Sequence, residues 1–146
     1  MRAGFDLAAI HRLLSDFAWA ADRGLADELS ALFFADGTLR VNDQEFRGRS
    51  AIADDCRRRA EIAHRRTRHV WSNLRVDTRE DGACDATLVQ LTYESLGADQ
   101  PLKLRVNDVR DRLERGADGR WRFRSRVIER QMALLMPNGA EPLTSA

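Results

Sequence analysis

The stretch TRHVWSNLRVDT at residues 67–78 decides the fold, because here the side chains begin to alternate with a period of two. In an extended strand, alternate residues lie on the same face. One face then carries Thr67, His69, Trp71 and Asn73, and the other carries Val70, Ser72, Leu74 and Val76. Three more strand-like stretches follow at residues 83–96, 101–115 and 120–132, and Asp-Gly pairs mark two of the turns between them.

The residues before this stretch have the spacing of helices. Apolar residues recur every three or four positions over residues 7–22, and Asp6 stands where a helix N-cap is expected. Two further helices are expected at residues 25–34 and 51–64, with a short strand at residues 38–41. Helices followed by antiparallel strands are typical of an α+β fold, with the helices on one face of a curved sheet. The concave space between them can bind a small molecule.

The composition is that of a single globular domain. The chain has 146 residues, of which 43% are hydrophobic and 32% charged, and its formal net charge is +1. A net charge so close to zero gives no general attraction to nucleic acid or to an anionic membrane. No apolar run approaches the roughly 20 residues of a membrane span. We expect a folded domain over residues 1–133 and a flexible tail over residues 134–146.

The cysteines give no sign of a disulfide framework or a metal site. Cys56 and Cys84 are too few for the former and lack the spacing of the latter. We interpret them as reduced thiols, which predicts a cytoplasmic protein. We also expect neither a metal nor an organic cofactor.

Asp22 and His69 are the candidates for chemistry. Asp22 lies beside the apolar stripe of the first helix and near its C-terminus, where the helix dipole disfavours a negative charge, so it needs a partner or exposure to water. If the two side chains meet, the carboxylate fixes the imidazole tautomer, and the imidazole can remove a proton from carbon or oxygen. Because no serine or cysteine nucleophile is evident, such a pair suits elimination or isomerisation. The spacing alone leaves open a surface role for Asp22 and a structural role for His69.

Several segments resemble the SnoaL-like branch of the nuclear transport factor 2-like superfamily, over roughly residues 7–132. They are FAWAAD at residues 17–22, LFFADG at residues 32–37, and Gly48 before Ile52. The TRH segment at residues 67–69, with Asn73-Leu74, is similar to the corresponding strand of hexachlorocyclohexane dehydrochlorinase and, more distantly, of scytalone dehydratase and bile acid dehydratases. The resemblance implies a cone-like sheet with three N-terminal helices around a pocket, and a catalytic dyad of Asp22 and His69.

Two positions depart from the dehydrochlorinase pattern. Phe17 stands where that enzyme has a lysine, and Trp71 stands where it has a glycine. The first difference removes a charge that would assist a leaving chloride, and the second reshapes the pocket. The resemblance therefore implies a dehydratase or isomerase. An arginine on the last strand of that enzyme matches Arg124, which becomes a candidate for anion binding in the pocket.

A second resemblance concerns the small subunit of aromatic-ring dioxygenases. The segments VNDVRDRL at residues 106–113, GRWRF at residues 119–123 and RVIE at residues 126–129 are similar to the last strands of that subunit, which is chiefly structural. The alternative to an enzyme is therefore a non-catalytic subunit or a ligand-binding module. That alternative predicts a larger partner or a pocket filled by side chains.

The expected pocket is apolar and suits a small apolar or aromatic molecule. Besides the dyad, its expected lining consists of Phe17, Trp19, Trp71, Asn73, Tyr93 and Arg124. If His69 faces the pocket, alternation places Val70, Leu74 and Val76 on the outer surface of the sheet, where they need cover. A homodimer packed sheet to sheet is the expected assembly, with a trimer as the alternative.

Overall fold

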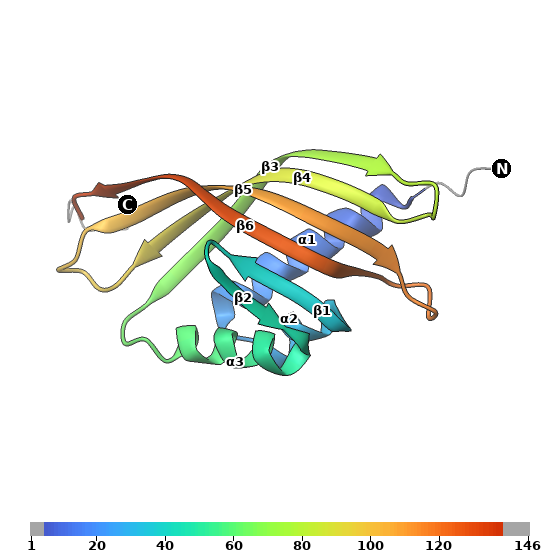
Figure 1. Ribbon diagram of the computed structural model, residues 1–146. Coiled ribbons are helices and arrows are strands. Elements are labelled where there is room, and N and C mark those ends of the chain that lie inside the picture. Colours follow the sequence, from blue (N-terminus) through green and yellow to red (C-terminus); the bar gives the residue numbers. More distant parts are fainter. Residues whose placement is uncertain (1–4, 139–146) are drawn as a thin grey trace, which may run out of the picture.

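The computed structural model describes residues 5–138 and has the predicted α+β arrangement. Three helices, α1 (Leu7–Arg23), α2 (Ala26–Ala31) and α3 (Gly48–Ala60), lie on one side of a curved sheet (Figure 1). The sheet consists of β1 (Phe33–Val41), β2 (Gln44–Arg47), β3 (Arg66–Thr78), β4 (Cys84–Ser95), β5 (Leu102–Arg115) and β6 (Trp121–Met136). No helix within residues 5–138 is long and apolar enough to cross a membrane.

The six strands follow the spatial order β2-β1-β6-β5-β4-β3. All neighbours are antiparallel except β1 and β6, which pair in parallel. The register shifts within the β1–β6, β3–β4 and β5–β6 pairs. Such bulges bend a strand and increase its twist, so they account for the strong curvature of the sheet around the helices.

Helix α1 is fixed at both ends by local chemistry. The Asp6 side chain accepts a hydrogen bond of 3.1 Å from the amide of Ala9, as an N-cap does. The helix ends at Gly24, which has a left-handed φ of +66° and lies so close to α3 that a Cβ there would be 2.8 Å from Cβ of Ala60. The face of α1 that packs on the sheet consists of Ile10, Leu13, Leu14, Phe17 and Ala20.

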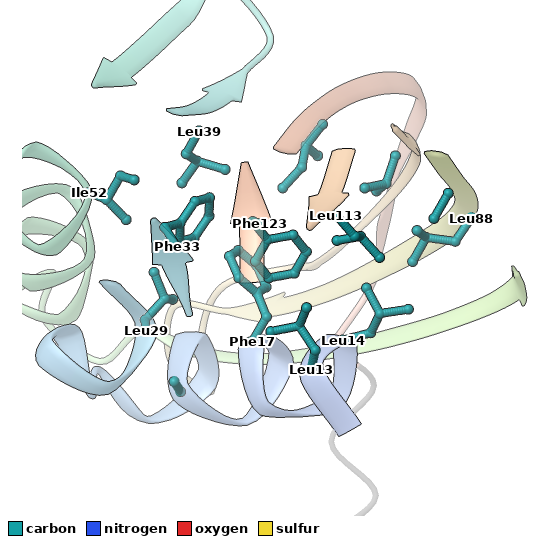
Figure 2. Packing of buried hydrophobic residues seen from close by; sticks show 14 of the residues in the cluster. Leu13, Leu14, Phe17, Leu29, Phe33, Leu39, Ile52, Leu88, Leu113 and Phe123 are labelled. Atoms are coloured by element: carbon teal, nitrogen blue, oxygen red, sulfur yellow. The ribbon is translucent and has the colours of Figure 1, made fainter. Parts of the chain in front are cut away.

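The apolar core lies between the helices and the sheet (Figure 2). Three aromatic rings meet there, with 5.8 Å between the centroids of Phe17 and Phe123 and 5.0 Å between those of Phe33 and Phe123. In the same layer lies a buried ion pair: Asp111 on β5 and Arg126 on β6, 0% and 1% exposed, approach to 3.5 Å. The Arg126 guanidinium packs on the Phe17 ring, 4.2 Å from its centroid.

A bulge in β3 changes which side chains face the helices. Asn73 has a left-handed φ of 57°, and the register with β4 shifts between Ser72 and Arg75. The prediction that Leu74 and Val76 lie on the outer surface is therefore wrong, because the extra residue turns both toward the core, against which they pack. Of the three apolar residues expected outside, only Val70 is exposed, at 49%.

Several elements differ from the sequence prediction. Helix α3 spans Gly48–Ala60 and not residues 51–64. Strand β1 begins at Phe33, within the segment expected to be helical, because its backbone pairs with Phe123 of β6. The hairpin strand β2 was not expected. Strand β6 runs to Met136, which pairs with Leu102, so the sheet extends three residues past the expected domain limit at residue 133. Residues 139–146 of the expected tail lie outside the described residues.

Candidate functional site

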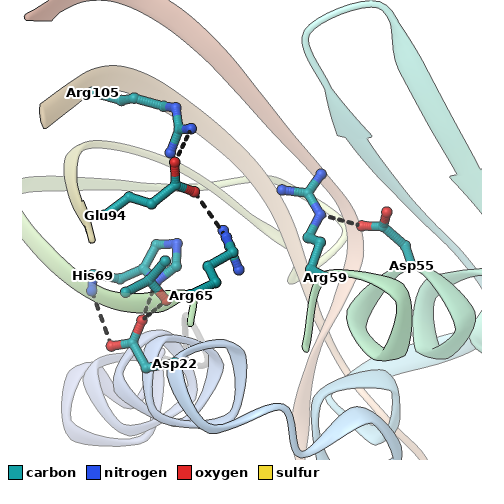
Figure 3. Close-up of polar contacts among 8 residues, drawn as sticks. Asp22, Asp55, Arg59, Arg65, His69, Glu94 and Arg105 are labelled. Atoms are coloured by element: carbon teal, nitrogen blue, oxygen red, sulfur yellow. Dashed lines mark hydrogen bonds and ion pairs between the residues drawn. The ribbon is translucent and has the colours of Figure 1, made fainter. Parts of the chain in front are cut away.

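The structure brings Asp22 and His69 together at the junction of α1 and β3. Asp22 is in the last turn of α1, and His69 is near the start of β3 on the face toward the helices. Asp22 Oδ1 lies 2.5 Å from His69 Nδ1, and Oδ2 accepts a hydrogen bond of 3.0 Å from the His69 amide. The Thr67 hydroxyl donates a third bond, of 2.9 Å, to Oδ1 (Figure 3). These donors offset the unfavourable position of a carboxylate at a helix C-terminus.

Burial and hydrogen bonding act on Asp22 in opposite directions. Its side chain is only 4% exposed, and this burial by itself raises the pKa of the carboxyl. The hydrogen bonds from His69 and Thr67, with the charge of His69, outweigh burial and leave the pKa of Asp22 below its ordinary value. Asp22 is therefore ionised at neutral pH. With Nδ1 directed at this carboxylate, the other ring nitrogen of His69, Nε2, is free to exchange a proton.

His69 also lines a cavity of about 760 Å³ between the sheet and the helices. Its side chain is 14% exposed, and the ring lies between Asp22, which it contacts through Nδ1, and the part of the cavity that holds Arg65 and Glu94 (Figure 3). Apolar lining comes from α1, α2, α3, β1 and β6. It includes Phe17, Ala21, Leu29, Leu39, Ile52 and Ile128. The cavity is thus apolar on one side only, which corrects the expectation of an apolar pocket.

The opposite wall is polar because of the phase of β4. Its first inward side chains, Cys84, Ala86 and Leu88, belong to the core. The next three on the same face are polar and buried, and they line the cavity: Gln90, Thr92 and Glu94. Sequence reasoning missed these residues. The sequence does carry a signal for them. Alternate residues of β4 face the interior, and the polar residues occupy the same alternate positions as the apolar residues before them.

Two groups of charged side chains border the cavity (Figure 3). Glu94, 7% exposed, accepts hydrogen bonds of 2.8 Å from Arg65 and 2.9 Å from Arg105. Burial alone raises the pKa of Glu94, but the two guanidinium groups outweigh burial and leave the pKa below its ordinary value. Across the cavity Asp55, 5% exposed, pairs with Arg58 and accepts a hydrogen bond of 3.0 Å from Arg59.

Of the other expected lining residues, only Phe17 borders this cavity. Trp19 and Trp71 border a separate, shallower hollow of about 470 Å³ between α1 and β3, on the other side of the dyad. Trp19 is 56% exposed, and the guanidinium of Arg23 packs on its ring. The rings of Trp71 and His11 pack edge to face, with 4.9 Å between their centroids. His69 lines both spaces, whereas Asp22 lines the shallower hollow and not the larger cavity.

Three further residues expected in the pocket lie elsewhere. Asn73 is exposed at the β3 bulge. Tyr93 is 41% exposed on the outer face, because the inward phase of β4 falls on its neighbours Thr92 and Glu94. Arg124 lies at a bulge of β6 and donates to Glu114 and Asp36, so its charge is used outside the cavity.

Within residues 5–138, no group of three or more His, Cys, Asp or Glu side chains could hold a metal ion. What the site offers is an imidazole with a buried carboxylate partner, beside a cavity large enough for a small organic molecule. Such an arrangement can take a proton from a bound molecule and return it.

Comparison with known proteins identifies the family. A family model described as the SnoaL-like domain matches residues 5–127, whereas no curated protein matches the chain. A protein from Catenulispora acidiphila, solved in complex with S-DNPA, is 29% identical with a TM-score of 0.75, and the match covers 84% of this chain and 91% of that one.

Two more distant structures share the fold. ActVI-ORFA from Streptomyces coelicolor is 21% identical, with a TM-score of 0.76 over 85% of this chain and 96% of that one. A hexachlorocyclohexane dehydrochlorinase, LinA type 2, is 19% identical, with a TM-score of 0.79 over 88% of this chain and 87% of that one. At such identities the likeness concerns the fold alone. Because the family model covers most of the sequence, the chain belongs to the SnoaL-like family, with the cone-like fold of the nuclear transport factor 2-like superfamily.

Proposed function

We propose that the protein is a cofactor-independent lyase or isomerase for a small molecule, in which His69 removes a proton from carbon and Asp22 positions and charge-stabilises the imidazole. The observation that carries the proposal is the 2.5 Å contact between Asp22 Oδ1 and Nδ1 of His69, whose side chain lines the cavity. The name of one structurally similar protein, a dehydrochlorinase, gives elimination chemistry further support.

In the dehydration we envisage, His69 Nε2 takes a proton from a carbon acidified by an adjacent carbonyl group. The electron pair of the broken C–H bond forms a C=C bond as the C–O bond to a β-hydroxyl group breaks. The imidazolium returns its proton to the leaving hydroxide, which departs as water. In an isomerisation, the same proton returns to a different carbon. Asp22 stabilises the imidazolium in both cases.

The open cavity supports an enzyme over the alternative of a purely structural subunit. A scaffold subunit needs no space among its buried side chains, whereas about 760 Å³ lies beside His69 here. Co-purification with a larger partner would still favour the alternative.

The test is turnover of β-hydroxy ketones and β-hydroxy thioesters in D₂O, with mass spectrometry reporting both loss of water and deuterium uptake next to the carbonyl. We expect His69→Gln to lower kcat by about 10²–10⁴-fold, the usual contribution of a general base. Asp22→Asn should lower kcat with little change in KM, because it acts through His69. The matched control is His11→Gln, an exposed histidine of α1 that we expect to leave turnover unchanged.

Circular dichroism separates loss of chemistry from loss of fold in these variants. Native turnover by a correctly folded His69→Gln protein would remove His69 from the mechanism. Equal losses in His69→Gln and His11→Gln would also contradict the proposal, because His11 lies outside the dyad.

The outer face of the sheet supports the further proposal of a homodimer. In register across four strands lie Val70, Leu91, Val106 and Met132. Val70 and Met132 are 49% and 60% exposed, so this apolar row lacks cover in the single chain. The row replaces Leu74 and Val76 as the basis for sheet-to-sheet packing. The free, buried thiols of Cys56 and Cys84 are consistent with our proposal of a cytoplasmic location.

A further inference from the structure

The charge of the cavity wall is not balanced by the protein itself. Among the described residues, five arginines border the cavity, against three carboxylates, those of Asp43, Asp55 and Glu94. The most buried group is the triad of Arg65, Glu94 and Arg105, with side chains 12%, 7% and 17% exposed. Two guanidinium groups share a single carboxylate there, so the triad keeps one positive charge. A charge is costly at such a depth unless a counter-charge approaches it.

The triad also keeps unused hydrogen-bond donors. An arginine has five N–H donors. Arg65 donates to Glu94 through Nε and Arg105 through Nη2, and no other partner of either guanidinium is found within residues 5–138. The triad therefore has both the charge and the free donors that bind a carboxylate.

Strand register places this triad near the candidate base. His69 pairs with Thr92 of β4, and Thr92 pairs with Arg105 of β5, so one rung of the sheet carries all three toward the cavity. Adjacent strands are about 4.8 Å apart, which puts the Cα atoms of His69 and Arg105 roughly 10 Å apart. A molecule a few bonds long can span this distance. The apolar side chains near Phe17 and Ile52 then face the rest of its carbon skeleton.

We propose that the substrate is an organic anion whose carboxylate binds Arg65 and Arg105 while its acidic carbon lies against His69. This rests on the proposed function for the reaction at His69, but the anion site is a separate element of the cavity. It also alters the sequence-based expectation of a purely apolar ligand. The carboxylate fixes the orientation of the substrate, and the apolar wall accommodates an aromatic or aliphatic body.

Calorimetry with matched neutral and charged probes tests the anion site without any turnover. The probes are benzoate with benzamide, and 2-naphthoate with 2-naphthamide. We expect each carboxylate to bind about tenfold or more tighter than its amide, the gain typical of charge-assisted hydrogen bonds. Arg105→Gln should remove most of this preference. The matched control is Arg110→Gln on the outer face, 64% exposed, which should retain the preference.

Glu94→Gln provides a test in the opposite direction. It keeps both arginines, adds one net positive charge and frees donors, so carboxylate binding should become severalfold tighter while amide binding stays the same. A residue with only a structural role would not produce this gain. Equal affinity for acid and amide, failure of both probes to bind, or weaker acid binding by Glu94→Gln would overturn the proposal.

The dyad variant separates this proposal from the proposed function. His69→Gln should preserve the preference for the carboxylate, because the donors belong to Arg65 and Arg105. Retained preference with no detectable turnover in any assay would remove the proposed reaction and leave the anion site. Turnover that depends on His69, without a preference for the carboxylate probes over the amides, would remove the anion site and leave the proposed reaction.

Discussion

Substitution of Asp111 by asparagine should make the protein more stable at neutral pH than it is with the native carboxyl. Asp111 and Arg126 face each other across β5 and β6, fully buried, with 3.5 Å between Oδ1 and Nε. Neither carboxylate oxygen of Asp111 has a hydrogen-bond partner among the described residues. Burial raises the pKa of Asp111 from 3.8 to about 6, since the attraction of Arg126 offsets only part of the desolvation.

The size of the expected change in the free energy of unfolding follows from the linkage between proton binding and folding. A carboxyl with a raised pKa contributes its full stability below pH 3.8, and this contribution is lost as the pH rises toward about 6. In that window the native state holds a proton that the unfolded chain releases. A shift of about two pKa units at about 1.4 kcal/mol each gives a loss of about 3 kcal/mol. Asparagine has nearly the same shape as the protonated carboxyl and does not titrate, so Asp111→Asn avoids this loss.

The assay is urea unfolding of the native protein and of Asp111→Asn at a series of pH values from acid to neutral. Titrating groups that the two proteins share contribute equally to both free energies of unfolding. Their contributions therefore cancel in the difference, which reports on Asp111 alone. We expect the variant to gain about 2–3 kcal/mol relative to the native protein between pH 4 and pH 8. A constant difference would refute the raised pKa. A difference of opposite sign would mean that an ionised Asp111 paired with Arg126 stabilises the fold.

Two other predictions concern the end of α1 and the outer face of the sheet. Gly24→Ala should lower the free energy of unfolding by roughly 1–3 kcal/mol in urea titrations, because its φ is +66° and the new Cβ would lie 2.8 Å from Cβ of Ala60. Its control, Gly82→Ala, shares the positive φ but has open space around it, so equal losses would rule out the contact with Ala60. Met132→Glu should convert a homodimer to a monomer in light scattering, whereas exposed Arg12→Glu should not. If Met132→Glu has the same molar mass as the native dimer, the interface does not include the surface around Met132.

The elements of the fold could be predicted because their periodicity is a local property of the chain. The change of period at residue 67 and the helical stripe over residues 7–22 correspond to β3 and α1. The pairing of β1 with β6 could not be predicted in the same way. It joins Phe33 to Phe123, far apart in sequence, and the gain from that pairing outweighs the local tendency of residues 32–34 to continue a helix.

The cavity lining was harder to predict, since it depends on the phase of each strand. The single extra residue at the Asn73 bulge exchanges the two faces for all later residues of β3. No residue type in this stretch identifies the bulge unambiguously. In the second half of β4, polar residues face inward, which reverses the usual assumption that apolar side chains point to the interior. Tyr93 therefore lies on the outer face and not in the expected pocket, whereas its neighbour Glu94 faces inward.

The contacts of Asp22 fit two roles. In one, Asp22 only ties α1 to β3; in the other, its carboxylate is the partner of a catalytic base, His69. The same contacts serve both roles. The His69 amide and the Thr67 hydroxyl already join Asp22 to the strand, without using the imidazole. The ring adds a third contact and at the same time borders the cavity, which a tether does not require. Because two of the three bonds survive in His69→Gln, we expect that variant to fold. Its loss of turnover would then report on chemistry at the free ring nitrogen and not on the attachment of α1.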